Sequence, residues 1–432
     1  MDSMQPLKWL KRLARNESGN ALVVCAATLP LVIGAAAIGV DTIQVSLARR
    51  QLQRAADSAA IAGAYAVLQS QSAATSVTHD LALNNDVTLS GSPVIENAPT
   101  AGPLAGNNRA VRVVLTAQRS VPFISFFMGS TMTVRVEATA AAVFSGQYCM
   151  VALENTNVTA ISFSGSTFVN LGCGVVSNST AATAVTAGGS SAIVASPVAA
   201  VGGVPSSSSY ANGTTLLPYS PPTPDPYASI PDPTVPSGCN NSKLNVQPGA
   251  GKDVTITAAD AVPGMPGVFC WRGADIGGTI SFPANSTVII DGGKLDFGAQ
   301  ADVRASGITF VLTSRTAATD PTSIAQVEMH GNAVLNITAP DSGTYKGLLM
   351  YQDRRTVYGS STINGNSATT YRGGFYFPNR QLLFNGNTGM HTECLQLVAR
   401  RLVFSGNSTV QNTCPTNGGA QAFDANFVRL VG

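Results

Sequence analysis

The candidate catalytic residues of this chain are acidic side chains near expected turns. Glycoside hydrolysis needs two carboxyl groups about 5 to 9 Å apart, and Asp291 and Asp296, which flank Gly-Gly-Lys-Leu, have a spacing that can meet this requirement. Asp353 precedes Arg354 and Arg355 at an expected strand end, and guanidinium groups suit sugar or phosphate. An Asp before Gly-Gly is also a typical turn residue, so Asp291, Asp296, Asp353 and Arg354 are weak candidates for a carbohydrate site.

The cysteines indicate disulfide chemistry. Cys25 lies in a long apolar segment, and the other six cysteines follow it. An even set in an exported region predicts three disulfides, although six cysteines allow fifteen connectivities. Neighbours along the chain give the following pairs: Cys149 with Cys173, Cys239 with Cys270, and Cys394 with Cys414.

The common catalytic and cofactor motifs are absent from the sequence. It contains no Gly-x-Ser-x-Gly, no Walker loop and no His-Glu-x-x-His, and its three histidines are far apart. His391-x-x-Cys394 is half of a zinc motif that has no second pair of ligands nearby in the sequence. We therefore expect no catalytic residue, no metal, no cofactor and no small-molecule substrate, and we predict that the protein is not an enzyme.

Charged side chains are scarce. Lys and Arg number 25 and Asp and Glu 23, so 11% of the 432 residues are charged, against about 25% in an ordinary soluble domain. The net charge of +2 and the scattered cations argue against nucleic-acid binding. A hydrophobic fraction of 44% excludes ordinary charged disorder. The 42 glycines, with many Ser, Thr and Asn residues, are typical of strands separated by tight turns.

The N-terminal region predicts a membrane anchor. Residues 1–20 form a basic segment with four Lys or Arg, and residues 21–40 contain no charged side chain. Twenty helical residues match a hydrocarbon core of about 30 Å. The preceding cations and the following Asp41 place the N-terminus in the cytoplasm. A cleaved signal peptide is the alternative, but its apolar core would have only about 7 to 15 residues.

The helix is expected to continue beyond the membrane as a stalk over residues 41–70. This segment has no Pro and keeps apolar residues at helical spacing. One helix from Ala21 to Gln69 would be roughly 75 Å long. Its Ala and Gly residues either permit close packing or act only as good helix formers.

These residues resemble the N-terminal region of TadE/TadG-like proteins of Flp (tight adherence) pilus assembly. The resemblance implies a bacterial inner-membrane protein with one N-terminal helix and a role in pilus biogenesis. Many members carry a von Willebrand A-type domain, whose Asp-x-Ser-x-Ser motif is absent here. The matching positions include Glu17, Gly19, Ala21, Pro30, Asp41, Leu52, Gln53 and Ala55–Ala60 with Ala56 and Asp57.

Residues 71–145 predict a small α+β segment. A short helix is expected near His79–Asn84, and alternating residues predict strands over Ala110–Arg119 and Thr131–Ala142. The apolar run Val121–Met128 is either a plug under these strands or a loop that touches the membrane.

The remainder predicts a right-handed parallel β-helix, with a β-sandwich as the alternative. A phrase of an apolar residue, a polar residue, Gly, a small residue and then Ser, Thr or Ala recurs, and its last three glycines are Gly365, Gly386 and Gly406. Spacing near 20 residues is typical of solenoids. First coils are expected over 146–204 and the main β-helix over 241–432. Several phrases here are also similar to the exported part of TadG-like proteins, among them Cys149–Leu153 and Val288–Gly293.

A Pro/Ser-rich segment over 205–240 interrupts the repeats. Its nine prolines predict an extended segment without regular pairing. It is either a hinge between two domains or an excursion along one β-helix, and repeat phrases on both sides favour the excursion.

Two functions follow. The first is a single-pass, inner-membrane, non-enzymatic component of Flp/Tad pilus assembly or anchoring, with its C-terminal region periplasmic or surface-exposed. Its expected partners are other membrane and periplasmic pilus-assembly proteins, and the lipid bilayer through residues 21–40. The alternative is a polysaccharide-binding or polysaccharide-cleaving β-helix tethered to the envelope.

Overall fold

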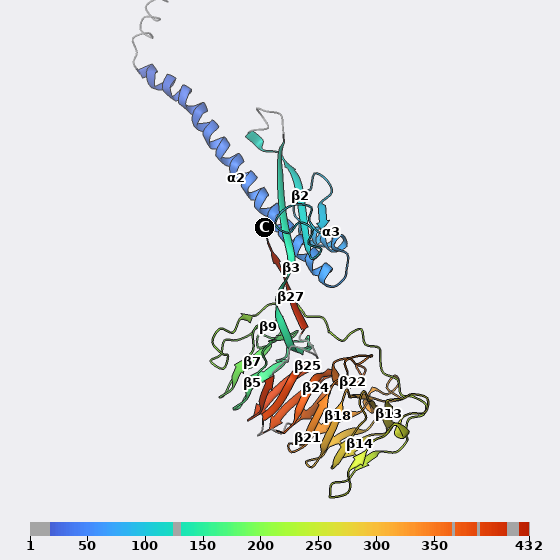
Figure 1. Cartoon of the computed structure of the whole chain (residues 1–432). Coiled ribbons are helices and arrows are strands. Elements are labelled where there is room, and N and C mark those ends of the chain that lie inside the picture. Colours follow the sequence, from blue (N-terminus) through green and yellow to red (C-terminus); the bar gives the residue numbers. More distant parts are fainter. Residues whose placement is uncertain (1–17, 124–130, 365–367, 387–388, 413–422, 432) are drawn as a thin grey trace, which may run out of the picture. The chain divides into compact units, whose positions relative to one another are not determined.

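The chain forms two compact units. The computed structural model describes residues 18–123, 131–364, 368–386, 389–412 and 423–431. One unit, here unit 1, comprises Met1–Val143 with Val428–Gly432, and unit 2 comprises Phe144–Phe427 (Figure 1). Each unit is described by itself.

The long helix α2 (Ser18–Leu68) has two parts with different surroundings. In the first part the apolar side chains are exposed, whereas Leu52, Ala56, Ala59 and Ala60 are fully buried in the core of unit 1. The helix that we expected is confirmed, but its second part is not a bare stalk. Small Ala side chains allow the helix backbone to approach a sheet closely, and this packing buries the segment.

Unit 1 places this helix against a small antiparallel sheet. The sheet pairs β1 (Val94–Asn97) with β2 (Ala110–Arg119), and β2 with the first part of β3 (Met132–Ala152). A short helix, α3 (Ala73–Asn84), also contacts α2 and begins at Ser72, whose hydroxyl accepts the amide hydrogen of Thr75. Alternate residues of β2 and β3 are buried because they face the helix.

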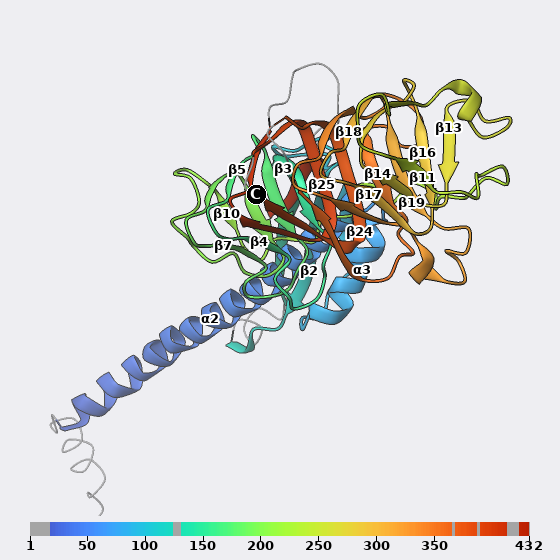
Figure 2. The ribbon, with the colours of Figure 1, turned by 90° about the horizontal axis from the view of Figure 1, so that it is seen from below.

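Unit 2 contains three sheets of parallel strands, and strands lie side by side through the whole unit in Figures 1 and 2. The first sheet, in spatial order, consists of β10 (Leu216–Leu217), β9 (Val198–Ala200), β6 (Gly174–Ser177), the end of β3, β25 (Gly389–Gly406), β24 (Thr370–Gly386), β22 (Leu348–Gln352), β19 (Thr309–Thr313), β16 (Thr287–Asp291) and β13 (Val268–Trp271).

The other two sheets are built in the same way. The second consists of β7 (Val185–Ala187), β4 (Ile161–Phe163), β25, β24, β23 (Gly359–Ile363), β20 (Gln326–Met329), β17 (Lys294–Phe297), β14 (Ala274–Ile276) and β11 (Leu244–Val246). The third consists of β8 (Ala192–Val194), β5 (Phe168–Asn170), β26 (Thr409–Asn412), β25, β24, β21 (Val334–Thr338), β18 (Asp302–Ser306), β15 (Thr279–Ser281) and β12 (Val254–Thr255).

Two short 3-10 helices, η1 (Ala258–Asp260) and η2 (Pro321–Ser323), connect strands of unit 2. Strand β27 (Phe423–Leu430) lies near the C-terminal end of the chain, and its last residues belong to unit 1. The parallel pairing of unit 2 argues against the β-sandwich alternative, because sandwiches pair their strands antiparallel.

The chain enters unit 2 in the middle of the stack of strands. The end of β3 pairs with β25, so that Val151 lies opposite Val398. From this point the early strands extend to β10 at one end of the first sheet, and the later strands return from β13 at the other end. Strands on both sides of the Pro-rich segment therefore belong to one compact unit.

The repeated phrases stack in register. Phe163, Phe384 and Phe404 are paired neighbours, with ring centroids 5.2 Å apart for Phe163 and Phe404 and 4.7 Å apart for Phe384 and Phe404. In the turn that follows, Gly165 has φ 74°, and a Cβ there would lie 2.6 Å from the carbonyl oxygen of Gly406. Only glycine fits this close approach of two backbones.

The first sheet is buried on both faces, whereas strands of the other two alternate. One continuous row of paired residues faces outward along the whole first sheet, with Cys270 at one end, Tyr351 and Tyr376 in the middle and Leu217 at the other end. This row forms a second apolar cluster outside the main core. Continuous apolar runs are what a sheet covered on both faces requires.

The cover of the first sheet is the Pro-rich segment of residues 218–238, which we name the strap. It begins after β10 and ends near β13. Along this path Thr223 bonds to Asn178, Tyr227 bonds to Gln396, and Cys239, just after the strap, bonds to Cys270. Proline has no amide hydrogen to satisfy, so a Pro-rich segment can cover a sheet without pairing as a strand.

Candidate membrane segment and candidate site residues

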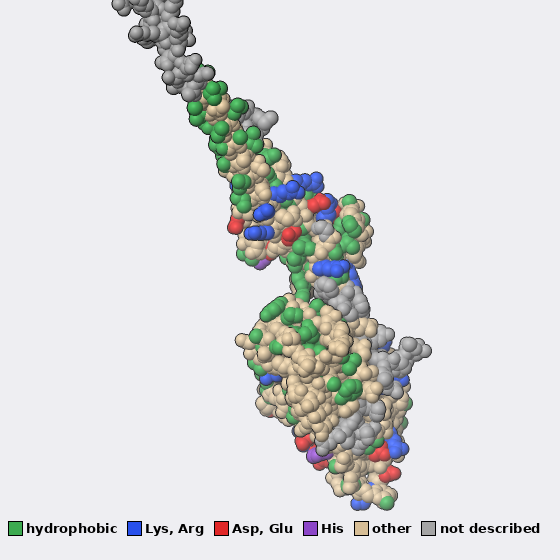
Figure 3. Space-filling model, turned by 90° about the vertical axis from the view of Figure 1, so that its left-hand side faces the viewer, with side chains coloured by type: hydrophobic (Ala, Val, Ile, Leu, Met, Phe, Trp, Pro, Cys, Tyr) green, Lys and Arg blue, Asp and Glu red, His purple; other side chains and the backbone are tan. Residues whose placement is uncertain are grey.

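The exposed part of α2 is the candidate membrane segment. Leu31 and Val32 are 73% and 67% exposed, and Figure 3 shows hydrophobic side chains along this part of the helix. Within the described residues, Val23–Leu68 is the helix long and apolar enough to cross a membrane by length and composition. Pro30 lies inside the continuous helix, as membrane helices tolerate.

Asp41 marks the change from exposed to packed helix. Its side chain is fully buried, and a carboxylate oxygen accepts the amide hydrogen of Phe123 at 3.4 Å. Of the expected apolar run, Val121 is buried and Phe123 is exposed, while 124–130 lie outside the described residues. Glu17 also lies outside the described residues, and Gly19 belongs to the first turn of α2.

The second group of family-type residues attaches α2 to the sheet. Leu52 and Ala56 are fully buried. The side-chain amide of Gln53 donates to the carbonyl oxygen of Glu137 in β3 at 3.0 Å and to the carboxylate of Asp57 at 2.8 Å. These residues act in packing and anchoring of the helix within unit 1.

Two disulfides are present among the described residues. Cys149 is bonded to Cys173, and Cys239 is bonded to Cys270. The first joins β3 to the residue just before β6, and the second joins the residue just after the strap to β13. The side chains of Cys394 and Cys414 lie outside the described residues, so the third expected pair stays a prediction.

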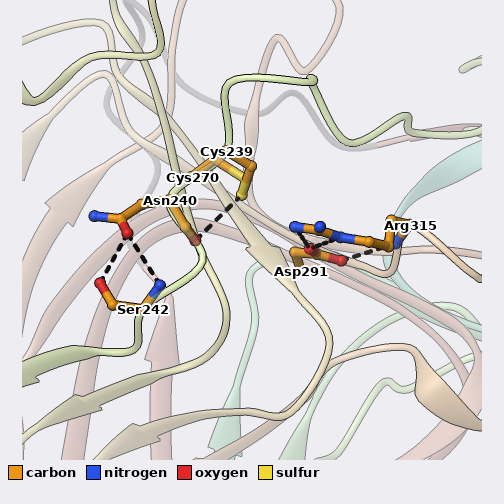
Figure 4. The surroundings of a disulfide bond; sticks show 6 residues. All are labelled: Cys239, Asn240, Ser242, Cys270, Asp291 and Arg315. Carbon is orange, nitrogen blue, oxygen red and sulfur yellow. Dashed lines mark hydrogen bonds and ion pairs between the residues drawn. A yellow bond between two sulfur atoms is a disulfide. The ribbon is translucent and has the colours of Figure 1, made fainter.

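Asp291 and Asp296 have separate partners. Asp291 is buried at the end of β16, where it accepts the backbone amide of Arg315 at 2.8 Å and pairs with its guanidinium. Figure 4 shows this ion pair near the disulfide of Cys239 and Cys270. The partners of Asp296 are Lys294 at 3.1 Å and His330 at 3.3 Å, and it lies opposite Asp275 and Glu328 on neighbouring strands.

Arg354 contacts the strap directly, and Asp353 acts on it through Arg355, which donates to the carbonyl of Pro233. Asp353 is fully buried and accepts from Thr313 and Arg355. The guanidinium of Arg354 donates to the backbone carbonyls of Tyr227, Ala228 and Ile230 at 2.9 to 3.0 Å. The guanidinium of Arg354 and the carboxylate of Asp353, which a sugar would need as partners, are thus already hydrogen-bonded within the chain. These contacts position the strap, and carbohydrate binding by Asp353 and Arg354 stays a prediction.

Sequence reasoning missed a buried carboxylate at the junction of the early and late strands. Glu154 follows β3 and pairs with Arg400 at 3.0 Å and Arg401 at 2.7 Å, both in β25. Burial acts to raise the pKa of Glu154, but hydrogen bonds from Thr156 and Arg401 and the attraction of Arg400 outweigh it and lower the pKa. The residues are about 245 positions apart, so no local pattern signals the pair.

Aromatic residues under the strap were also missed. The hydroxyl of Tyr227 donates to Gln396 at 2.7 Å, and that of Tyr376 donates to Asp225 at 2.7 Å. Burial raises the pKa of both tyrosines, with a further rise for Tyr376 from the hydrogen bond to Asp225. Both therefore stay protonated and act as donors at physiological pH.

These features define a mainly β protein with parallel sheets and one candidate membrane helix at the N-terminal end. Residues 19–66 match the model of a family described as putative Flp pilus-assembly TadE/G-like. This match confirms the resemblance over that segment and supports involvement in Flp/Tad pilus assembly. No curated protein matches the chain.

Proposed function

We propose that this protein is a membrane-anchored, non-enzymatic component of Flp/Tad pilus assembly or anchoring at the bacterial envelope. The observation that carries the proposal is the family match over residues 19–66. The matched segment also supports the proposal, because its first part exposes apolar side chains and its second part packs in the core of unit 1. A helix of this kind links a bilayer to a folded domain.

The anchoring proposal places the N-terminus in the cytoplasm and the remainder outside the inner membrane. It rests on the exposed apolar side chains of α2, the basic segment before them and the two disulfides of unit 2. Disulfides persist in oxidising compartments such as the bacterial periplasm. Partners are proposed to be other membrane and periplasmic pilus-assembly proteins.

We infer that unit 2 is a right-handed parallel β-helix with three strands per coil. Support comes from the pairing pattern, in which strand β16 pairs with β19, β17 with β20 and β18 with β21. An offset of three strands is what one coil with one strand in each sheet produces. The right hand is the one that nearly all parallel crossover connections adopt.

The non-enzymatic assignment is supported by the surroundings of the candidate carbohydrate residues. Asp291 and Asp353 are buried and paired with arginine, and Arg354 is occupied by the strap.

Crosslinking in cells tests the proposed role. A photo-activated residue at the exposed Gln51 of α2 is expected to trap other pilus-assembly proteins, whereas one at the buried Ala59 is not. Recovery of only uncrosslinked chain from Gln51 would contradict the proposal. Release of reducing ends from envelope polysaccharide by the purified chain, lost in Asp296→Asn, would instead support the polysaccharide alternative.

A further inference from the structure

Contacts within unit 1 show which part of α2 lies beside which end of β2. A Cβ added to Gly63 would lie 2.8 Å from Val111 at the start of β2. The amide of Gln53 reaches the backbone of β3 at 3.0 Å, and the carboxylate of Asp41 meets the amide of Phe123, which follows β2. The strand β2 therefore runs along α2 toward the exposed apolar part of the helix.

Five arginines gather at this end of unit 1. Arg49 and Arg50 lie on α2 between Asp41 and Gln53, and Arg119 ends β2 shortly before Phe123. The other two are Arg54, one helical turn beyond Arg50, and Arg135, opposite Thr116 in the sheet. We name these five residues, Arg49, Arg50, Arg54, Arg119 and Arg135, the arginine cluster. Figure 3 shows blue side chains gathered near the end of the hydrophobic stretch of the helix.

The arginine cluster lacks compensating charge. All five side chains are exposed, and none forms an ion pair with another residue in the described part of the chain. Of the acids on the same part of α2, Asp41 is buried and Asp57 accepts from Gln53. Arg50 and Arg54 are four residues apart on one helix, a spacing at which like charges repel.

Glu96 and Glu137 both pair with Arg112, so Glu137, two residues from Arg135 in β3, is already bound to a cation outside the cluster. Arg112 therefore shows how unit 1 neutralises an arginine with its own carboxylates. Among the described residues no carboxylate forms an ion pair with the arginine cluster, so anions from outside the chain can neutralise it.

Exposed apolar side chains lie at the same level. Ile43 and Leu47 on α2 are 62% and 53% exposed, and Phe123 and Met132 beside the end of β2 are 42% and 44% exposed. Met132 is the register partner of Arg119. Arginines next to exposed apolar residues, directly beyond a membrane segment, match the headgroup region of a bilayer, where cations meet phosphate and apolar side chains meet acyl chains.

We propose that the arginine cluster binds the phosphate headgroups of anionic phospholipids in the leaflet from which α2 emerges. Unit 1 then rests on the bilayer, with Phe123 and Met132 in the interface. The proposal rests on the membrane anchoring of α2 and adds to it a second contact, which fixes the folded part of unit 1 at the membrane surface.

The full chain in vesicles tests this contact. Phe123→Trp provides a fluorescent probe, and its signal is taken as the difference from the unsubstituted chain, in which Trp9 and Trp271 are the background. A lipid with a quencher at the headgroup should quench it at least about twofold more when roughly one third of the phosphatidylcholine is replaced by phosphatidylglycerol. About 1 M salt should remove this difference, because it shortens the screening length to about 3 Å.

A charge-reversed variant identifies the residues responsible. The combined changes Arg49→Glu, Arg50→Glu and Arg119→Glu should abolish the difference between the two lipid compositions. A matched control reverses three exposed cations of unit 2, Lys252→Glu, Arg272→Glu and Lys346→Glu, and should leave it unchanged. Should the first variant fail to fold, the salt dependence of the unreversed chain still decides the matter.

Two outcomes would overturn the proposal. One is equal quenching in neutral and anionic vesicles, which would point to an acidic protein as the partner, and the other is equal behaviour of the two reversed variants. Failure of the anchor itself is seen separately with Val32→Trp, whose fluorescence should be quenched by a label at the end of the acyl chains. An unquenched Val32→Trp chain would show that α2 does not insert, whatever the arginine cluster does.

Discussion

Buried charges in unit 2 join segments that are distant in sequence. Glu154 ties the end of β3 to two arginines of β25, and Asp353 positions Arg355, whose guanidinium also donates to the carbonyl of Pro233 in the strap. A buried carboxylate with its partners removed is strongly destabilising. At this scale the few charged residues act as connections of the fold.

We predict that Glu154→Gln lowers the free energy of unfolding by about 1 to 3 kcal/mol at pH 7. The pKa of Glu154 is lowered in the folded state, so its contribution is present above the unfolded pKa of about 4.3 and is lost as pH falls through the folded pKa. The difference between the two chains, measured by urea unfolding in detergent, should therefore shrink in acid.

The matched control is Glu328→Gln. The Glu328 carboxylate is 42% exposed and pairs with Lys294, and exposed pairs contribute less than about 1 kcal/mol. A loss as large for this variant as for Glu154→Gln, or a loss for Glu154→Gln that persists unchanged in acid, would contradict the assignment.

We predict that Arg354→Lys frees the strap. An ammonium cannot reach three carbonyl oxygens as the planar guanidinium does, so local opening should become about tenfold or more frequent. Chymotrypsin cleavage after Tyr227 reports this opening, because the ring is otherwise packed edge-on against Tyr376. Arg304→Lys, at an exposed pair with Asp302, should leave the cleavage rate unchanged, and equal rates in the two variants would argue against the latch.

At the scale of elements, whether a sheet face is covered determines the pattern of apolar residues along its strands. The first sheet has continuous apolar strands because the strap covers its outer face, whereas strands of the second and third sheets alternate because one face meets solvent. In α2 likewise, the apolar residues of the first half face outward and the alanines of the second half face a sheet.

We predict that Gly63→Ala destabilises unit 1. The new Cβ would lie 2.8 Å from methyl groups of Val111 and Val77, and such overpacking costs about 1 to 3 kcal/mol, more than the gain of about 1 kcal/mol in helix propensity. Thermal unfolding in detergent should show a lower midpoint. Gly39→Ala, with nothing within 4 Å of the new Cβ, should not lower it. A neutral Gly63→Ala would mean that the helix can move away from β2.

Elements with a strong local pattern were predictable from sequence. The expected helix Ala21–Gln69 corresponds to α2, and the expected strand Ala110–Arg119 coincides with β2. A long apolar period or a strict alternation shows which face of a segment is buried. Both patterns can be seen within the segment itself, so such elements are predictable.

Pairing across long separations was not predictable. Nothing local in Val151 or Val398 reveals that they are neighbours, and the energy that aligns β3 with β25 comes from packing along the whole stack. The same limit affected the candidate site. Asp296 was paired with Asp291 by nearness in sequence, whereas its contacts across the sheet are set by a register that joins Asp275, Asp296 and Glu328.

For unit 2 as a whole, the order of strands places β24 and β25 between an early group, β3 to β10, and a late group, β11 to β23. Each strand pairs only with neighbours in the stack, so the stability of the whole is close to a sum of interfaces between adjacent coils. The strap crosses from one end of this stack to the other and opposes separation of the two groups.

We predict that Phe404→Ala separates the two groups, whereas Phe269→Ala loosens only one end. Both side chains are fully buried, and truncation costs about 3 to 5 kcal/mol at either site. Phe404 stacks between Phe384 and Phe163, at the interface of β25 with β4. Phe269 lies in β13, the last strand of the first sheet.

Hydrogen exchange of individual strands distinguishes these outcomes. In Phe404→Ala, exchange should rise in β4, β6 and β9 while β16 and β19 stay protected, because the early group opens at its interface with β25. In Phe269→Ala the rise should be confined to β13 and the neighbouring β11 and β14, since the rest of the stack keeps both of its neighbours. A uniform rise over all strands in either variant would show that unit 2 unfolds as one cooperative block, in which the position of a lost contact along the stack does not matter.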